Sequence, residues 1–367
     1  MWIYLTLLVP VLVIIVAKLM YDKFLSWYEM LGCIVITLII LAIGRGIGTS
    51  MATADYEYWN GYATEAIYYE DWNEEVTYYV TVTHGSGKYE YTTTEARTRV
   101  DYHPEFWVVN GTLASSSISK KQFDELTKLW GNKRFVDMHR DYDTNDGDSY
   151  VTTYDKVVNH TIPQTLRKCY TNKLLRSKSV FNFEKLTKEE KKLVYDYPTE
   201  RTYNFNYIIG DNNVTANKTF AEYNAVYGAN KKVTMFLLVF KDVTVNSIER
   251  AYLQERYWFG GNKNEIVTCV GVNKNKISWV KTFSWSDEKT LLLTIDSNIL
   301  KEKTYNINSI VCTIVSQVNL TWKKKDFKEF DYVEVDLPDW ANILTILLSF
   351  IGCGVFLVFS LQTQEKE

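Results

Sequence analysis

Three uncharged stretches lie at the two ends of the chain, and mixed polar and apolar residues fill the middle. The stretches cover residues 2–17, 30–44 and 340–361. A helix needs about 20 apolar residues to cross a membrane, which the third stretch provides alone and the first two provide with their flanks. The pattern therefore predicts three transmembrane helices: a helical hairpin within residues 1–48 and a C-terminal helix over 340–361.

Small residues on the predicted membrane helices favour close helix packing. Gly44 and Gly48 lie on the second helix, and Gly352 and Gly354 lie on the third. Glycine lets helix backbones approach in a bilayer, although it is also frequent in membrane helices without that role. These four glycines are our candidate packing residues. Pro10 falls in the middle of the first predicted helix, where neighbours in a bundle can satisfy the freed carbonyl.

The flanking charges divide equally between the two sides of the predicted membrane, so they do not orient the chain. Two further features favour an exported domain: the N-terminal flank has no Lys or Arg, and residues 326–339 are rich in acids. We therefore expect a multi-pass membrane protein whose large domain is extracytoplasmic, in the periplasm or at the cell surface. The alternative for the first stretch is a cleaved signal peptide, but a basic start and a clear cleavage site are lacking.

Residues 55–215 are expected to form a β-rich lobe with short helices. Residues 76–83 and 88–100 are rich in β-branched and aromatic side chains that alternate with polar ones, which is typical of strands. A turn at 84–87 joins them. Ser119 with Gln122 forms a capping box that begins a helix, and Gly131 is expected to end it.

Residues 216–337 are expected to form an α/β lobe. Continuous apolar runs predict strands buried on both faces, and helical periodicity predicts the elements between them. The expected strands are 233–241, 265–272, 276–285 and 290–296; the expected helices are 217–227 up to Gly228, Ser247 to Phe259, and 308–323. The fold class is therefore α+β, with three transmembrane helices anchoring a two-lobed domain.

Composition restricts the function classes. The 367 residues are 46% hydrophobic with a net charge of −3, which excludes an intrinsically disordered chain and argues against nucleic acid as a partner. Three cysteines fall in the domain, Cys169, Cys269 and Cys312. An odd number allows one disulfide at most, and three reduced buried thiols are equally compatible.

The acidic segment 137–148 is the candidate metal site. Its oxygen-bearing side chains are Asp137, Asp141, Asp143, Asn145 and Asp148, with Asp146 between the last two. Calcium takes six to eight such ligands. The spacing starts like an EF-hand loop, but the glycine comes one residue late, at Gly147, and no glutamate closes the loop. A solvated hairpin turn explains the same residues.

His139 is the candidate acid or base in that segment. On a strand it shares a face with Asp137 and Asp141, so the three side chains could serve a metal or a proton transfer. A solvated strand face is the alternative. A Ca²⁺ ion or another divalent cation bound here is the one cofactor that we consider.

Four segments of the domain carry a family resemblance: EYWNGYATEAIYYEDW (57–72), DYHPEFW (101–107), GNKRFVDMHRDYDTNDGDSYV (131–151) and YWFGGNKNEIVTCVGV (257–272). Together they resemble a family of uncharacterised membrane-anchored proteins of bacteria and their phages, which implies an anchored envelope protein and transfers no catalytic residues. The order of elements in 232–323 is also similar to the TPM domain, a small α/β module exposed outside membranes. Some TPM domains are linked to phosphatase activity with acidic metal ligands, but no residue of this chain corresponds to those ligands.

The sequence favours a non-enzymatic, membrane-anchored envelope protein that mediates protein interaction or assembly. Its expected partners are the lipid bilayer and another membrane or envelope protein, or further copies of itself. Two alternatives stay open. One is a metal-dependent hydrolase of the TPM-like phosphatase type, and the other is an envelope glycan-binding module that uses exposed aromatic rings.

Overall fold

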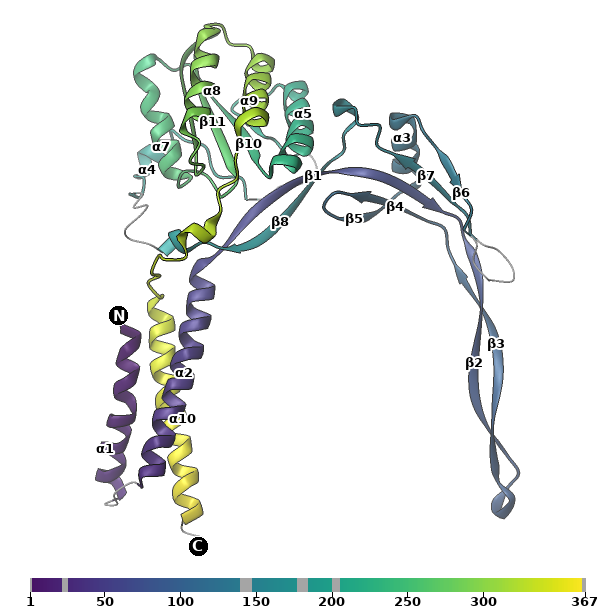
Figure 1. The fold of residues 1–367 in the computed structure, drawn as a ribbon, viewed down its shortest axis with the longest axis vertical. Helices are drawn as coiled ribbons and strands as arrows, with labels where there is room; N and C mark the ends of the chain where they lie inside the picture. The colour runs from purple at the N-terminus through teal and green to yellow at the C-terminus, as the bar shows by residue number, and fades with distance from the viewer. Residues whose placement is uncertain (1, 22–25, 139–146, 177–183, 200–204, 365–367) are drawn as a thin grey trace. The chain divides into compact units, whose positions relative to one another are not determined.

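The computed structural model describes residues 2–21, 26–138, 147–176, 184–199 and 205–364, and shows a mixed α+β protein (Figure 1). The chain divides into two compact units. The first contains residues 1–57, 169–184 and 326–367; the second contains residues 58–168 and 185–325. Both ends of the chain therefore belong to one unit, which also takes in a short internal segment.

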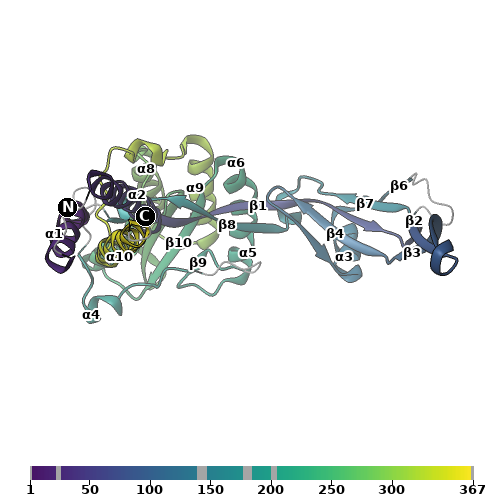
Figure 2. The ribbon, with the colours of Figure 1, turned by 90° about the horizontal axis from the view of Figure 1, so that it is seen from below.

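Helices dominate the first unit. They are η1 (Trp2–Leu8), α1 (Val9–Tyr21), α2 (Trp27–Thr53) and α10 (Asp339–Gln364), and Figure 2 shows α1, α2 and α10 clustered end-on. Two of them, α2 and α10, are long and apolar enough to cross a membrane. The first predicted span instead forms a shorter apolar helix over residues 3–19, so a third crossing stays a prediction.

The N-termini of α1 and α2 follow from local chemistry. Pro10 lies in the first turn of α1 and not in mid-helix as predicted, because the preceding residues form the 3₁₀ helix η1. Proline is well tolerated there, since the first N–H groups of a helix have no intrahelical acceptor. At the start of α2, Ser26 accepts a hydrogen bond from the Glu29 N–H, and the Glu29 carboxylate accepts one from the Ser26 N–H. This capping box fixes the helix start.

Polar contacts hold the other segments of the first unit. The Asp55 carboxylate accepts hydrogen bonds from the Tyr170 hydroxyl at 2.9 Å and the Asn172 amide at 2.8 Å. The Lys173 ammonium lies 3.1 Å from the Asp331 carboxylate. The segment 169–176 therefore ties the residues that follow α2 to those that precede α10.

A six-stranded sheet lies in the N-terminal half of the second unit, in the described part of the chain. Its strands are β1 (Ala54–Tyr69), β4 (Phe106–Gly111), β5 (Ser115–Ile118), β6 (Arg134–Val136), β7 (Ser149–Thr153) and β8 (Pro163–Thr171), in the order β5-β4-β1-β7-β6 with β8 also on β1. Helix α3 (Lys120–Trp130) packs on it through Phe123, Leu126 and Trp130. The predicted capping box at Ser119 and the left-handed Gly131 at the helix end are both present.

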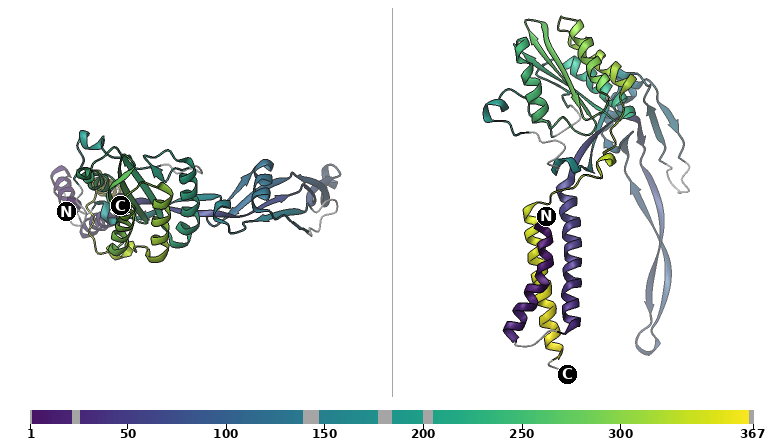
Figure 3. Two further views of the ribbon diagram at one scale, coloured as in Figure 1. Left: turned by 90° about the horizontal axis from the view of Figure 1, so that it is seen from above. Right: turned by 60° about the vertical axis from the view of Figure 1, so that its left-hand side comes forward.

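A four-stranded sheet forms the α/β part of the second unit. Its strands are β9 (Ile208–Ile209), β10 (Thr234–Lys241), β11 (Glu265–Asn273) and β12 (Lys276–Ser284), in the order β12-β11-β10-β9. Strands β9, β10 and β11 are parallel to one another, and β12 runs antiparallel to β11. Helices α5 (Val214–Tyr223), α7 (Glu249–Tyr257), α8 (Lys289–Lys301) and α9 (Ile307–Thr321) accompany the sheet (Figure 3). Their apolar side chains complete one buried core with the strands.

Three predictions about this part are wrong at the level of single elements. Residues 290–296 form helix α8 and not a strand; their buried side chains recur at the helical period. Helical backbone does not end at Gly228: a π-helical turn over Asn224–Gly228 leads directly into α6 (Ala229–Lys231), and the helix ends at Lys232 with φ +53. Ser247 is not the N-cap of α7 as predicted, because it lies within the 3₁₀ turn η6 (Val245–Ile248) that precedes this helix.

Gly228 has a packing role in place of the predicted helix-ending one. A Cβ at this position would lie 2.6 Å from the Val233 carbonyl oxygen and 3.0 Å from the Asn60 amide nitrogen. Asn60 is itself buried and donates hydrogen bonds to the Val233 carbonyl and the Thr234 hydroxyl. The absence of a side chain at Gly228 therefore lets β1 and the start of β10 approach.

Candidate functional site

The predicted metal segment is described only at its two ends. Asp137 follows β6 and Asp148 precedes β7, which pairs with β6 in an antiparallel hairpin. Asp141, Asp143, Asn145 and Asp146, together with His139, lie outside the described residues. The Met138 N–H donates a hydrogen bond of 3.1 Å to the Asp148 carboxylate, so this acid ties the two limbs of the hairpin. Within the described residues, no three His, Cys, Asp or Glu side chains gather as a metal site.

Three of the four candidate packing glycines face the partner helix. A Cβ on Gly44 would collide with Thr345 of α10, and one on Gly48 would lie 3.1 Å from Leu337. A Cβ on Gly352 would lie 3.0 Å from both Ile36 and Ile40. Gly354 has open space around it. The close approach of α2 and α10 thus depends on glycine from both helices.

A bare β-hairpin is the most unusual surface of the second unit. Strands β2 (Trp72–His84) and β3 (Tyr91–His103) pair over all 13 of their residues, and the sheet that they form has no third strand in the described chain (Figure 1). At about 3.3 Å per residue the ribbon is roughly 40 Å long. An isolated two-stranded hairpin is at best marginally stable in water. The two outer edges of this ribbon are therefore of interest as surfaces to which a further strand could be added.

One face of the hairpin carries its charges, and these charges satisfy one another. Arg97 lies 3.4 Å from Glu95, and Arg99 lies 3.1 Å from Asp101. On the same face, His103 lies 3.1 Å from Glu74. Because each of these groups already has a counter-charge on the ribbon, this face does not call for a charged partner.

The opposite face is uncharged except for Glu75, and we call it the threonine face. Three threonine pairs oppose each other across the strands: Thr77 with Thr98, Thr81 with Thr94, and Thr83 with Thr92. Tyr79 lies among them and is 73% exposed. Tyr102 is 62% exposed on the same face but pairs with Asn73, six residues along β2 from Tyr79. At about 20 Å apart, the two rings do not form one stacking platform for a glycan.

The two edges of the hairpin differ in charge. Strand β3 has four charged residues between positions 95 and 101, and charged side chains discourage strand addition. Strand β2 has none from Val76 to Thr83, and that segment also lacks proline and glycine. Eight such residues on an open edge are a template for pairing with another strand. The β2 edge is therefore the candidate functional site.

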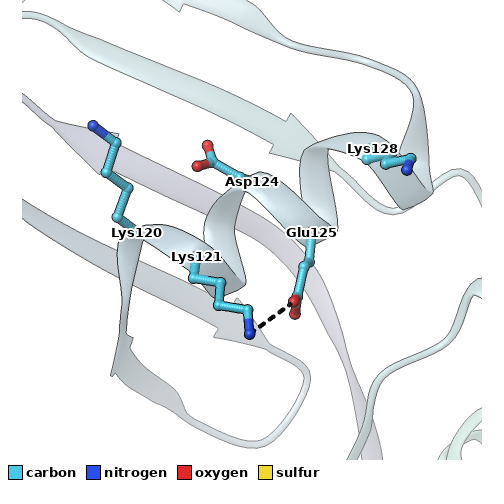
Figure 4. Close-up of a pocket in the computed structure, with 5 residues that line it drawn as sticks. All are labelled: Lys120, Lys121, Asp124, Glu125 and Lys128. Atoms are coloured by element: carbon cyan, nitrogen blue, oxygen red, sulfur yellow. Dashed lines mark ion pairs between the residues drawn. The ribbon is translucent and has the colours of Figure 1, made fainter.

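A shallow hollow on α3 is a weaker candidate. Figure 4 shows its lining, which alternates in charge along the helix: Lys120, Lys121, Asp124, Glu125 and Lys128. The one ion pair drawn joins Lys121 and Glu125 at 4.0 Å, with side chains 86% and 64% exposed. Such a pair is a solvated surface contact worth little energy.

A polar cluster lies where the parallel strands of the α/β sheet end, and sequence reasoning missed it. The Asp211 carboxylate, after β9, lies 3.0 Å from the Lys241 ammonium at the end of β10 and accepts a hydrogen bond from the Tyr305 hydroxyl. Burial alone would raise the pKa of Asp211, but hydrogen bonds from these neighbours and the Asn213 N–H outweigh it and lower the pKa. The motif Ile-Ile-Gly-Asp was the available signal, because carboxyl ends of parallel strands commonly carry function.

A partly buried acid, Asp296, lies on α8 and contacts Thr282 of β12. Burial raises the pKa of Asp296 to about 6, against the opposing effect of hydrogen bonds from the side chain and backbone of Thr282. One of its carboxylate oxygens is buried with no hydrogen-bond partner. Because its hydrogen bonds go to Thr282 of the neighbouring strand β12, we treat Asp296 as a determinant of stability.

Comparisons with known proteins add no relative to this picture. No family model, no curated protein and no solved structure matches the chain. The β2 edge therefore stays the foremost candidate site among the surfaces of the described residues.

Proposed function

We propose that this is a membrane-anchored assembly protein whose copies join through the β2 edges of their hairpins. The observation that carries the proposal is the uncharged, unpaired edge from Val76 to Thr83. Helices α2 and α10, long and apolar enough to cross a membrane, support the anchored location. Two hairpins joined at this edge would form a four-stranded sheet, which exceeds the three strands that stable sheets generally require.

The sequence of β2 suits pairing with a second copy of itself. An antiparallel pair with its twofold axis at Tyr79 places Tyr79 opposite its own copy and Thr77 opposite Thr81. On the other face it places Val76 opposite Val82. β-Branched and aromatic cross-strand pairs of this kind stabilise antiparallel sheets by roughly 0.2–1 kcal/mol each.

The charges at the ends of the strand do not oppose this register. Glu74 of one copy comes opposite His84 of the other at both ends of the pair, while each keeps its partner within its own ribbon, His103 and Glu95. No like charges face each other between these positions, since residues 76–83 are uncharged. Identical edges usually repel through their charged residues, and this edge lacks that protection against self-pairing.

Disulfide trapping tests this register directly. In the full-length chain in detergent, with the exposed Cys169 and Cys312 replaced by serine, Tyr79→Cys should give a cross-linked dimer on mild oxidation. The matched control is Tyr102→Cys, which is similarly exposed but lies on β3, away from the proposed axis. A dimer from Tyr79→Cys alone supports the proposal. Equal cross-linking of both variants, or of neither, would overturn it.

The oligomeric state gives a second, independent readout. Tyr79→Lys would place two ammonium groups directly opposite each other, so the parent chain should be larger than a monomer by light scattering and the variant should be smaller. The hairpin bears its side chains in solvent, so the variant leaves the folded core intact. A parent chain that is monomeric at every concentration would contradict self-assembly and favour a different protein as the partner.

We propose further that the large domain is extracytoplasmic. The support is the sequence pattern alone: a start without basic residues and an acid-rich stretch before α10. With three crossings, the segment from α10 to Glu367 would lie in the cytoplasm. A reporter active only in the cytoplasm, fused after Glu367, should therefore give signal. Activity of a reporter that needs export would reverse the orientation.

A further inference from the structure

Two cysteines of the first unit lie against each other across the α2–α10 interface. Cys33 is on α2 and Cys353 is on α10, 320 residues later, and both are fully buried. The Cys353 thiol donates to the Cys33 carbonyl oxygen at 3.5 Å and lies 3.4 Å from the Thr37 hydroxyl. Cys33 and Thr37 are four residues apart and share one helix face, so the Cys353 sulfur rests in the groove that this face presents.

The surrounding packing keeps the two helices in register at this level. Gly32 of α2 leaves room for the Phe356 ring of α10, and Gly352 of α10 leaves room for Ile36 of α2. Ala17 of α1 closes the same cluster with Leu357. One thiol therefore cannot move from the other without displacing a close-packed layer.

A polar layer lies one helical turn from the thiols, on the side of the α2 N-terminus. The Ser360 hydroxyl donates to the Glu29 carboxylate at 2.9 Å, and Glu29 precedes Cys33 by four residues. The two thiols are therefore followed by a polar contact between the same two helices, which also holds α2 against α10.

The other cysteines of the chain lack such a neighbour. Cys269 is buried within β11, while Cys169 and Cys312 are exposed on different elements. All five are reduced in this structure. The Cys33–Cys353 arrangement is the one place where two thiols from distant parts of the sequence meet among the described residues.

We propose that Cys33 and Cys353 form a reversible disulfide that staples α2 to α10. In the oxidation each thiol gives up one proton and one electron, and a sulfur–sulfur bond forms. The two electrons and two protons pass to a lipid-soluble quinone, which becomes the quinol. The disulfide would join the helix that precedes the intervening residues to the helix that follows them, and so hold α2 and α10 together covalently.

Thiol counting tests the staple. The probe is a short-chain benzoquinone, added to the full-length chain in detergent with Cys169→Ser and Cys312→Ser. After denaturation, a maleimide polymer should label Cys33, Cys269 and Cys353 in the untreated chain, and Cys269 alone in the oxidised chain. Mass spectrometry should then show the two helix peptides joined with a loss of two hydrogens.

Two variants distinguish the Cys33–Cys353 disulfide from other reactions that consume thiols. Cys353→Ser should keep both remaining thiols reactive after quinone treatment. Cys353→Ser combined with Gly354→Cys keeps the number of cysteines but moves the thiol to a position facing open space, so it should not cross-link. Three reactive thiols in the oxidised parent would overturn the proposal. So would a disulfide that runs as a dimer on a non-reducing gel.

Discussion

The Asp211 carboxylate and the Lys241 ammonium lie 3.0 Å apart at the carboxyl ends of two neighbouring parallel strands. The Asp211 side chain is 13% exposed and the Lys241 side chain is 53% exposed, so the carboxylate is largely buried while water still reaches the ammonium. The Tyr305 hydroxyl adds a third member from the segment before α9. Asp211 thus connects three parts of the α/β region: the segment after β9, the end of β10 and the segment before α9.

Asp211→Ala should destabilise the second unit by about 1–3 kcal/mol, because it leaves the Tyr305 hydroxyl and the Lys241 ammonium without their acceptor. The pH dependence has a definite sign. The pKa of Asp211 is lowered on folding, so its contribution is present at neutral pH and is lost as the pH falls below the ordinary carboxyl range. Chemical denaturation at pH 7 and pH 3 would measure this. Equal losses of unfolding free energy at pH 7 and pH 3 would contradict a contribution from the ionised Asp211 carboxylate.

Asp296→Asn should stabilise the protein at pH 8 and have little effect at pH 4. The folded pKa of Asp296 is raised to about 6, so the folded chain holds the proton more tightly and loses stability as the pH rises toward that value. Removing the charge should recover about 1–2 kcal/mol. Thermal unfolding against pH measures the effect. Asp124→Asn, on the exposed face of α3, is the control and should shift nothing.

Gly44→Ala should weaken the α2–α10 interface, while Gly46→Ala should not. A Cβ on Gly44 would collide with Thr345, whereas one on Gly46 meets nothing within 4 Å. Overpacking of this kind costs about 1–3 kcal/mol, and replacing an unpacked helical glycine by alanine gains roughly 0.5–1 kcal/mol. Thermal unfolding of the full chain in detergent compares the two. A loss of stability at Gly46 equal to that at Gly44 would contradict the packing explanation, because a Cβ on Gly46 has no neighbour to displace.

Millimolar calcium should leave the melting temperature of the chain unchanged. The segment 137–148 lacks the glycine position and the closing glutamate of an EF-hand loop, and Asp148 already accepts a backbone hydrogen bond from Met138. Differential scanning calorimetry with and without calcium tests this. A rise in melting temperature that Asp141→Asn and Asp143→Asn abolish would instead establish a cation site in this segment.

Elements with strong local signals could be predicted well from the sequence. The helix after Ser119 has a capping box, an apolar stripe and a terminal glycine, and all three are present in α3. Residues 290–296 show the limit of this reasoning. A short apolar run fits a buried strand or a buried helix face, and only packing shows that Leu291, Leu292 and Ile295 are buried while Leu293 is 68% exposed.

The candidate surfaces were harder to predict from the sequence than the helices and strands were. The hairpin was expected from its alternation and its turn, but a missing third strand depends on residues elsewhere in the chain. Asp211 was overlooked because its partners, Lys241 and Tyr305, are distant in sequence. The membrane orientation, the TPM-like resemblance and the cation site stay predictions.

The sequence by itself determined which segments are apolar enough to enter a membrane, where α3 begins and ends, and that residues 76–83 would form a strand. These features depend on neighbouring residues, through periodicity, capping and side-chain shape. Tertiary structure alone decided that no strand of the described residues covers the β2 edge and that Cys33 meets Cys353. Such contacts join residues far apart along the chain, so their formation depends on how whole elements pack and not on any local pattern.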